Sequence, residues 1–276
     1  MTTRHPNPHA IHGRVLIVAG SDSGGGAGIQ ADIKAVSALN AYAMTAIAAL
    51  TAQNTTGVYG VVPVDPAFVA LQMKIVLEDI GADAIKVGML ANAAVIEAVA
   101  GAYEERAVNV PLVIDPVMVA KSGHFLLEPD AVLTLRKRLL PLAELVTPNL
   151  PEAEALTGIP VRNLDDMRRA AAMIRTFGPK AVLLKGGHLE EDQLHDLLLT
   201  EDGEVLFEGR RHHTPHTHGT GCTLSSAIAA GIAQGLPLRD AVARARAYVE
   251  TAILTAPGFG HGHGPLNHLH TVKPFP

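Results

Sequence analysis

The chain has 276 residues, of which 48% are hydrophobic and 18% are charged, a balance that indicates a globular protein with ample material for a core. Aromatic residues make up only 4% and tryptophan is absent, so we expect an aliphatic core. The formal charge of −5 and the lack of a basic run argue against a nucleic-acid partner, and the single cysteine excludes an internal disulfide framework and fits a reducing compartment.

The chain shows no sign of a membrane or secretory segment. No apolar run is long enough to span a bilayer, and the first residues, MTTRHPNPHAIHG, lack the apolar middle of a signal peptide. We therefore expect residues 1–13 to form a loose tail, residues 14–276 to form one domain, and the protein to be cytoplasmic with no membrane contact.

Short apolar strands alternate with helical patterns along the chain. RVLIVA (14–19) is rich in β-branched residues, and it is followed by a glycine-rich loop and a helical pattern over 27–39. The same alternation continues with strands at DAIKVG, PLVIDP, AELVTPN and AVLLKGG and with helices at about 91–103, 131–139, 151–157 and 165–177. Repeated strand–helix units predict a mostly parallel sheet with helices on both faces.

Two stretches depart from this alternation. HDLLLTEDGEVLFEG predicts an antiparallel hairpin that turns at 201–203, and TGVYGVVPVD (56–65) predicts an extended flap over the end of the sheet. Two helices, at about 220–234 and 238–255, close the chain. Because ligands of such sheets bind at the carboxyl ends of the strands, we expect the loops described next to meet at one edge.

The loop after the first strand, GSDSGGGAG, invites a nucleotide-binding interpretation. It lacks the Gly-Lys-Ser/Thr ending of a Walker A loop. Gly26, Gly28 and Ala31 match the dinucleotide fingerprint, but AYAMTAIAALTAQN supplies no acidic residue at the end of the second strand, which disfavours NAD. The glycines still predict a tight turn that a small ligand can approach closely. Asp22 and Asp32 flank this loop, and Asp32 fits a solvated helix position as well as a ligand.

Polar residues end three further strands. In TPNLPEAEALTG, Asn149 and Glu152 lie three residues apart, a spacing that can hold Mg²⁺ or can cap a helix, and the local sequence alone favours capping. Lys185, in LLKGGH, fits a phosphate contact or a solvated strand end. Asp115, before Pro116, fits a site residue or a turn.

Two segments, RHHTPHTH and HGHGPLNHLH, hold several of the fourteen histidines. They are rich in glycine or proline and have no adjacent carboxylate, which argues against a zinc site. His218 and the C-terminal histidines stay open as residues that line a pocket.

The only cysteine, Cys222, lies in HTHGTGCTLSSAIAAG at the start of a helical pattern whose apolar positions Leu224, Ile228 and Ile232 recur every four residues. Unpaired N–H groups of a glycine-rich helix start, together with the helix dipole, form an anion site. We expect such a site to lower the pKa of the thiol and to suit it to work as a base or nucleophile. The alternative is a small buried hydrophobic residue.

Seven segments occur in a specific order: AGSDSGGGAGIQADIK, TAQNT, KVGML, DPVMVAKSG, TPNLPEAEALTG, LLKGGH and THGTGCTLSSAIAAG. Together they resemble the hydroxymethylpyrimidine/phosphomethylpyrimidine kinases of thiamine biosynthesis, within the ribokinase-like superfamily, over about residues 14–270. The resemblance implies a ribokinase-like three-layer α/β/α sandwich with a mostly parallel central sheet, no large separate lid, and a homodimer.

The resemblance also implies two successive phosphorylations with ATP and Mg²⁺, from 4-amino-5-hydroxymethyl-2-methylpyrimidine to its monophosphate and then to its diphosphate. The roles that the motifs imply fall into four groups. They are pyrimidine binding by Gly20, Asp32, Gln53 and Val117; Mg²⁺-ATP binding by Asn149, Glu152 and Lys185, with Asp115 and Glu152 on the metal; an anion hole of Gly219, Thr220 and Gly221; and a base at Cys222.

Phosphoryl transfer depends mainly on alignment and charge neutralisation. The first acceptor is an alcohol that must lose a proton, whereas the second is a phosphate oxygen that is already ionised, so we expect Cys222 to matter mainly for the first step. Three alternatives stay open: a pyridoxal kinase on the same fold, a non-catalytic nucleotide- or vitamin-binding protein, and a thiol-transfer enzyme, which would normally need a second cysteine.

Overall fold

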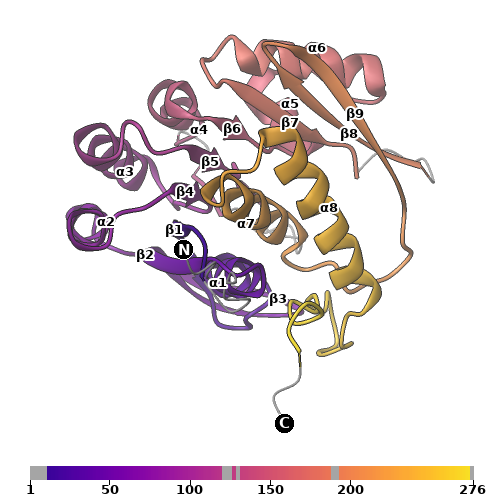
Figure 1. Cartoon of the computed structure of the whole chain (residues 1–276), viewed down its shortest axis with the longest axis horizontal. Coiled ribbons are helices and arrows are strands. Elements are labelled where there is room, and N and C mark those ends of the chain that lie inside the picture. Colours follow the sequence, from indigo (N-terminus) through magenta and orange to yellow (C-terminus); the bar gives the residue numbers. More distant parts are fainter. Residues whose placement is uncertain (1–10, 120–125, 129–130, 188–192, 274–276) are drawn as a thin grey trace, which may run out of the picture.

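The computed structural model describes residues 11–119, 126–128, 131–187 and 193–273. Within these residues, nine strands form one sheet (Figure 1). They are β1 (Arg14–Asp22), β2 (Tyr42–Asn54), β3 (Gly57–Pro63), β4 (Ala84–Val87), β5 (Leu112–Ile114), β6 (Leu145–Val146), β7 (Ala181–Lys185), β8 (Gln193–Thr200) and β9 (Gly203–Arg210). Their order across the sheet is β3-β2-β1-β4-β5-β6-β7-β8-β9.

The middle of the sheet is parallel. β1 pairs in parallel with β2 and β4, and parallel pairing continues through β5 and β6 to β7. The two ends are antiparallel, because β3 folds back on β2 and the hairpin β8–β9 folds back on β7. The predicted α/β architecture with a mostly parallel sheet is therefore confirmed.

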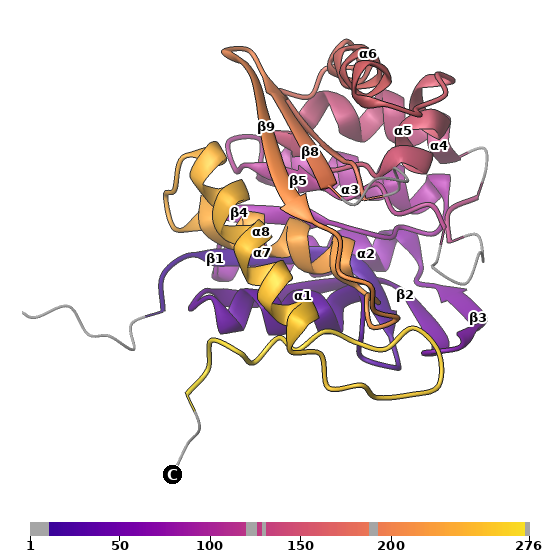
Figure 2. The same ribbon diagram turned by 90° about the vertical axis from the view of Figure 1, so that its right-hand side faces the viewer.

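Helices cover both faces of this sheet (Figures 1 and 2). The helices α1 (Gly28–Ala38), α7 (Thr220–Ala233) and α8 (Leu238–Leu254) pack on one face. The other face carries α2 (Pro66–Asp79), α3 (Ala93–Arg106), α4 (Ala131–Thr134), α5 (Leu150–Thr157) and α6 (Leu164–Arg175). Among the described residues, none of the helices combines the length and apolarity needed to cross a bilayer.

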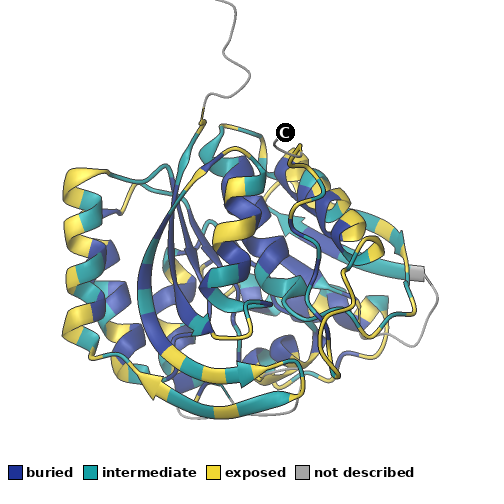
Figure 3. Cartoon of the chain, turned by 90° about the horizontal axis from the view of Figure 1, so that it is seen from below, coloured by how far each residue is buried: buried dark blue, intermediate teal, exposed yellow. Residues whose placement is uncertain are grey.

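Strand β1 shows how the sequence produces the two layers. Successive side chains of a strand point to opposite faces. Val15 and Ile17 therefore pack with α1, α7 and α8, whereas Leu16 and Val18 pack with the helices of the other face, and all four are fully buried. This two-sided burial explains why the segment is apolar throughout. Figure 3 shows the resulting pattern, with buried strands inside and exposed residues on the outer helix surfaces.

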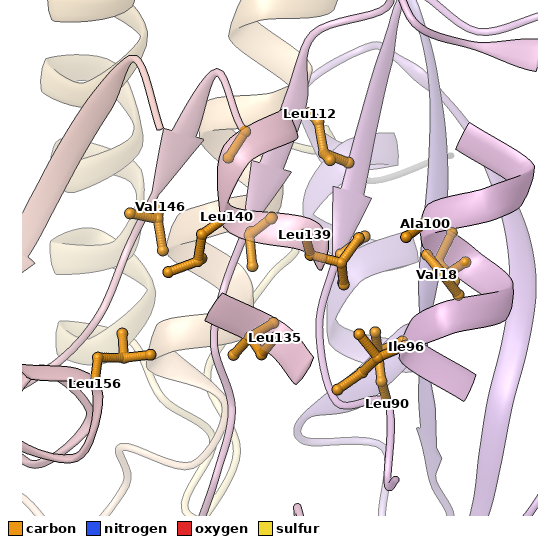
Figure 4. Close-up of a cluster of buried hydrophobic side chains, with 14 of the residues drawn as sticks. Val18, Leu90, Ile96, Ala100, Leu112, Leu135, Leu139, Leu140, Val146 and Leu156 are labelled. Carbon is orange, nitrogen blue, oxygen red and sulfur yellow. The ribbon is translucent and has the colours of Figure 1, made fainter. Parts of the chain in front are cut away.

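A cluster of buried hydrophobic side chains lies on each face of the sheet, and the larger of these two clusters is on the face that carries α2 to α6. Ile96 of α3 and the leucines Leu135 and Leu139, which follow α4, are among its side chains (Figure 4). The segment Leu135–Leu139 is a π-helical turn and Leu140–Leu142 is a 3₁₀ turn, so the helix predicted over 131–139 is only partly an α-helix. The expected aliphatic core is confirmed by these clusters.

Most predicted elements appear within a few residues of their predicted bounds, and the hairpin and the extended flap appear as β8–β9 and β3. One helix was not predicted, namely α2. The signal for it was present, since Pro66 occupies its first turn and Asp65 caps it by accepting a hydrogen bond from the Phe68 N–H at 3.1 Å. Of the expected tail at 1–13, residues 1–10 lie outside the described part of the chain.

Candidate active site

The carboxyl ends of the parallel strands open into one cavity of about 1080 Å³. Residues that end β1, β4 and β7 line it, together with the loops after β5 and β6 and the start of α7. The prediction that the singled-out loops meet at one edge of the sheet is confirmed. The cavity lining includes Gly20, Gln53, Asp115, Val117, Asn149, Glu152, Lys185, Gly219, Thr220, Gly221 and Cys222.

Asp32 is the exception among the predicted site residues. It is fully buried in α1, where its Oδ2 accepts a hydrogen bond from Lys86 Nζ at 2.8 Å and its Oδ1 accepts one from Ser226 Oγ at 2.7 Å. Both carboxylate oxygens have protein partners and Asp32 is fully buried, so its interpretation as a solvated residue is wrong, while a contact with the pyrimidine stays a prediction. The turn of α1 directs Asp32 towards β4 and α7 instead of towards the loop.

Asp22, at the end of β1, organises the glycine-rich loop. Its carboxylate accepts hydrogen bonds from the N–H groups of Gly24 at 2.8 Å, Gly26 at 3.1 Å and Ala27 at 2.8 Å, and it lies 2.8 Å from Nε2 of His218. Burial alone would raise the pKa of Asp22, but the hydrogen bonds from His218 and the loop outweigh it and lower that pKa. One carboxylate thus fixes the loop and ties it to the segment before α7.

The start of α7 is pressed against this loop. Gly219 is the N-cap of α7 and has a φ of +81°, and a Cβ at this position would lie 1.8 Å from the carbonyl oxygen of Gly26. Only glycine permits both the left-handed backbone and this contact. No side chain caps the helix, and residues 219–222 line the cavity, so the first-turn N–H groups provide a site for an anion.

Cys222 lies in this first turn and keeps some exposure to the cavity. Burial among protein atoms raises the pKa of its thiol to about 12; the Lys86 charge and the Gly28 N–H lower it, while Asp32 and Asp115 raise it. The prediction of a lowered pKa is therefore wrong. The helix start is only one influence, and burial with two nearby carboxylates outweighs it.

Asn149 and Glu152 form the predicted helix cap. Asn149 Oδ1 accepts the Glu152 N–H at 2.9 Å, and Glu152 Oε2 accepts the Asn149 N–H at 2.8 Å, which is a reciprocal capping box at the start of α5. Both residues also line the cavity. Burial raises the pKa of Glu152 to about 7, against the opposing charge of Lys185. Burial thus favours the protonated form of this carboxyl group.

Lys185 and Asp115 form an ion pair beneath the first turn of α7. Lys185 Nζ lies 3.0 Å from Asp115 Oδ1, and a Cβ added to Gly221 would lie 3.2 Å from Nζ and 3.4 Å from Asp115 Oδ2. The missing side chain at Gly221 thus lets the helix start approach the pair. A cation and a helix N-terminus that converge in this way suit a phosphate group.

The donors near this pair also suit Mg²⁺. Asp115 and Glu152 supply carboxylates and Asn149 an amide, and Mg²⁺ in nucleotide sites is typically bound by one or two carboxylates together with phosphates and water. Within the described ranges, no group of three or more His, Cys, Asp and Glu side chains could hold a metal ion alone. The two carboxylates and the amide fit a metal whose other ligands are phosphate oxygens and water.

One end of the cavity fits a small ring. Ala49, Met89 and Ala91 form an apolar cluster against which Val117 packs. Gln53, at the end of β2, brings an amide to the cavity, and its Nε2 lies 3.3 Å from Nε2 of His218. An apolar pocket with an amide that both donates and accepts suits a nitrogen-containing ring.

The cavity continues towards the hairpin and α8. Its lining there includes Phe207 of β9, the segment 210–215, and Val249 and Ile253 of α8. The His212 Nε2 lies 3.0 Å from Oε1 of Glu250. The volume lies at the upper end of the range for ligand pockets, which leaves room for two small ligands that meet at the start of α7.

Sequence reasoning missed Lys86 and gave Asp22 no role. A signal for Lys86 existed, since a lysine within the apolar strand DAIKVG must be buried if the strand is central. For Asp22 the signal was its position before a run of glycines, whose N–H groups a carboxylate can bind.

The family model described as Phosphomethylpyrimidine kinase matches residues 22–267. The chain is similar to the hydroxymethylpyrimidine/phosphomethylpyrimidine kinase of Bacillus subtilis, with 45% identity over 93% of this chain and 94% of that relative. It is 50% identical, over 93% of its length, to the thiamine biosynthesis bifunctional protein ThiED of Geobacter sulfurreducens, of which it spans 52%.

A solved structure of a pyridoxal kinase shares this fold. The crystal structure of an ADP complex of Bacillus subtilis pyridoxal kinase matches with a TM-score of 0.85 and 35% sequence identity, over 94% of this chain and 98% of that chain.

The contact between Gly219 and the loop leads to a test of stability. Gly219→Ala should lower the free energy of unfolding by about 1–2 kcal/mol for the left-handed backbone and by about 1–3 kcal/mol more for the clash with Gly26. Gly235→Ala is a matched control, because Gly235 has a φ of +83° and nothing within 4 Å of its added Cβ. Urea unfolding of both variants measures the difference, and equal losses would contradict the argument.

Proposed function

The chain belongs to the phosphomethylpyrimidine kinase family, and we propose that its cavity binds an aminopyrimidine and ATP so that they meet at the start of α7. The activity is phosphorylation of 4-amino-5-hydroxymethyl-2-methylpyrimidine to its monophosphate and then to its diphosphate, in thiamine biosynthesis. The observation that carries the proposed arrangement is the convergence of Gln53, the Asp115–Lys185 pair and the α7 N-terminus on one cavity.

The pyrimidine occupies the end of the cavity near Gln53. The Gln53 amide pairs with the aminopyrimidine edge, because it can donate to a ring nitrogen and accept from an amino group. Gly20 and Val117 border the ring. A Cβ at Gly20 would lie 2.7 Å from the Met89 sulfur, so the glycine keeps this end of the cavity open.

ATP occupies the end of the cavity near α8, with its phosphates towards α7. The N–H groups of Gly219, Thr220 and Gly221 stabilise the charge of the transferred phosphoryl group, and Lys185 approaches the phosphates. Asn149, Glu152 and Asp115 hold Mg²⁺ with the nucleotide. When bound, Mg²⁺ supplies charge neutralisation to the phosphate oxygens.

Cys222 is the base of the first reaction. Its sulfur, as thiolate, takes the proton of the substrate hydroxyl while the new O–P bond forms and the bond between phosphorus and the ADP oxygen breaks. The raised pKa makes thiolate scarce near neutral pH but strongly basic once formed. The second reaction transfers the phosphoryl group to an ionised phosphate oxygen and needs no base. Cytoplasmic conditions, which keep thiols reduced, suit a free Cys222.

Pyridoxal is the second candidate substrate. The structural similarity to a pyridoxal kinase, at a TM-score of 0.85, favours it over a non-catalytic binding protein or a thiol-transfer enzyme. Pyridoxal also presents a hydroxymethyl group on a nitrogen-containing ring, so the same apolar pocket and anion hole suit it. An aminopyrimidine differs in offering an amino group to Gln53.

The exposed face of α2 suits the homodimer that the family resemblance implies. Phe68, Leu71 and Ile75 follow one another at helical spacing and are 55%, 47% and 54% exposed. Residues three, four and seven apart share one helix face, so these side chains form an apolar stripe on the surface. We assign this stripe to the contact between two copies of the chain.

Product analysis tests the substrate. Incubation with the aminopyrimidine alcohol and excess ATP should yield the monophosphate first and the diphosphate later, as separated by anion exchange and identified by mass. Pyridoxal added at equal concentration should be phosphorylated more slowly. Faster turnover of pyridoxal than of the pyrimidine would favour the alternative substrate instead.

Cys222→Ala tests the base. The variant should lose about 10²- to 10⁴-fold in kcat on the alcohol, the usual range for a general base, and less than about tenfold on the monophosphate. In the unchanged protein, the rate on the alcohol should rise with pH across the neutral range, because the thiolate fraction rises below a raised pKa. Equal losses in the two reactions would exclude a role confined to the first step.

Phe68→Glu tests the dimer surface. A charge in the middle of the apolar stripe should halve the molar mass measured by light scattering at micromolar concentration. Phe259→Glu is the control, because Phe259 is an exposed phenylalanine as well, with an exposed fraction of 67%, but lies outside α2. The assignment of the surface is wrong if the Phe68 variant keeps the mass of the unchanged protein.

A further inference from the structure

Lys86 is a charged side chain at the centre of the sheet. It lies in β4 between Ile85 and Val87, and like them it is fully buried. An ammonium buried in a protein costs several kcal/mol even after relaxation, and apolar side chains of similar volume often replace a buried ion pair without loss of stability. The presence of this charge therefore calls for a reason other than stability.

The structure holds the Lys86 ammonium in one place. Nζ donates to Asp32 Oδ2 at 2.8 Å, and Asp32 is fixed in turn by Ser226 Oγ at 2.7 Å. A Cβ added to Gly88 would lie 2.8 Å from Nζ, so the glycine leaves the space that the ammonium occupies. Lys86, Asp32 and Ser226 belong to β4, α1 and α7, and together they fix the position of the ammonium.

The Lys86–Asp32 pair lies against the part of α7 that carries Cys222, because Ser226, which donates to Asp32, comes about one helical turn after Cys222. Lys86 lines the cavity, and the hydrogen bond to Asp32 uses one of the three N–H donors of an ammonium. The charged groups that act on the Cys222 sulfur are Lys86 from β4, Lys185 from β7, Asp32 from α1 and Asp115 after β5. After burial, the Lys86 charge is the largest influence on the thiol pKa, and it lowers it.

We propose that Lys86 is a positioning residue of the first phosphoryl transfer, which stabilises the thiolate of Cys222 that takes the hydroxyl proton. Asp32 holds the ammonium in place and, through its own negative charge, partly offsets the lowering of the Cys222 pKa by Lys86. The inference rests on the proposed role of Cys222 as the base. It gives the buried pair Lys86–Asp32 a function and explains why a lysine interrupts an otherwise apolar strand.

Alkylation of Cys222 tests this inference without any kinase assay. Cys222 is the only cysteine, so the rate of iodoacetamide modification of the full-length protein at pH 8.5 reports on this thiol alone. Lys86→Met should slow modification about three- to tenfold, because a rise of one pKa unit lowers the thiolate fraction tenfold and the higher basicity of the remaining thiolate offsets part of that loss. Asp32→Asn should speed it by a similar factor.

The opposite expected changes in the alkylation rate of the two variants distinguish an electrostatic effect from loosened packing. Loosened packing would expose the thiol and speed its modification in both variants. The double variant Lys86→Met/Asp32→Asn leaves no buried charge unpaired, so it should unfold at nearly the temperature of the unchanged protein. It should still be alkylated more slowly than that protein, since the influence of Lys86 exceeds that of Asp32. Unchanged alkylation in Lys86→Met and in the double variant would overturn the inference.

Kinase assays complete the test. Lys86→Met should lose at least tenfold in kcat on the alcohol and less than about threefold on the monophosphate, with an unchanged KM for ATP. Equal losses in both reactions would overturn the inference and indicate that the ammonium contacts the transferred phosphoryl group. Full activity of Cys222→Ala on the alcohol would instead exclude the proposed base, while the alkylation rates would still decide whether Lys86 acts on the thiol.

Discussion

The site depends on one carboxylate, that of Asp22. By accepting hydrogen bonds from the N–H groups of Gly24, Gly26 and Ala27, it converts a glycine-rich segment into a fixed turn at the end of β1. Its contact with His218 joins this turn to the segment before α7, nearly two hundred residues later. The first turn of α7 thus has a defined position relative to the sheet, and an anion site at a helix start is useful only if that position is fixed.

The histidine-rich C-terminal segment packs against the β2–β3 turn and α7, next to the cavity. The His263 N–H donates to the carbonyl of Thr55 at 2.8 Å, next to the hairpin that carries Gln53. His268 is buried and its Nε2 lies 2.9 Å from Thr223 Oγ1 in α7. Burial lowers the pKa of His268 to about 4, so the ring is neutral at physiological pH and can accept from the threonine. These two histidines therefore connect elements around the cavity.

Sequence reasoning located most of the fold and of the candidate site because both follow from local rules. Strand ends in a parallel sheet meet at one edge, which is why Asn149, Lys185 and Cys222 converge although they are far apart in the chain. It failed where the environment of a side chain is set by distant segments. Asp32 finds its partner Lys86 54 residues later, and the pKa of Cys222 depends on charges from three other elements.

Burial is the main cause of both raised pKa values at the site, and a carboxylate that the two groups share adds to it. Asp115 raises the pKa of Cys222 and of Glu152, and each of these two groups is also raised by burial. Negative charge gathered in a medium of low dielectric favours the protonated form of every acid nearby. The same negative charge favours a cation nearby. Lys86 supplies such a cation to Cys222, and Lys185 supplies one to Glu152.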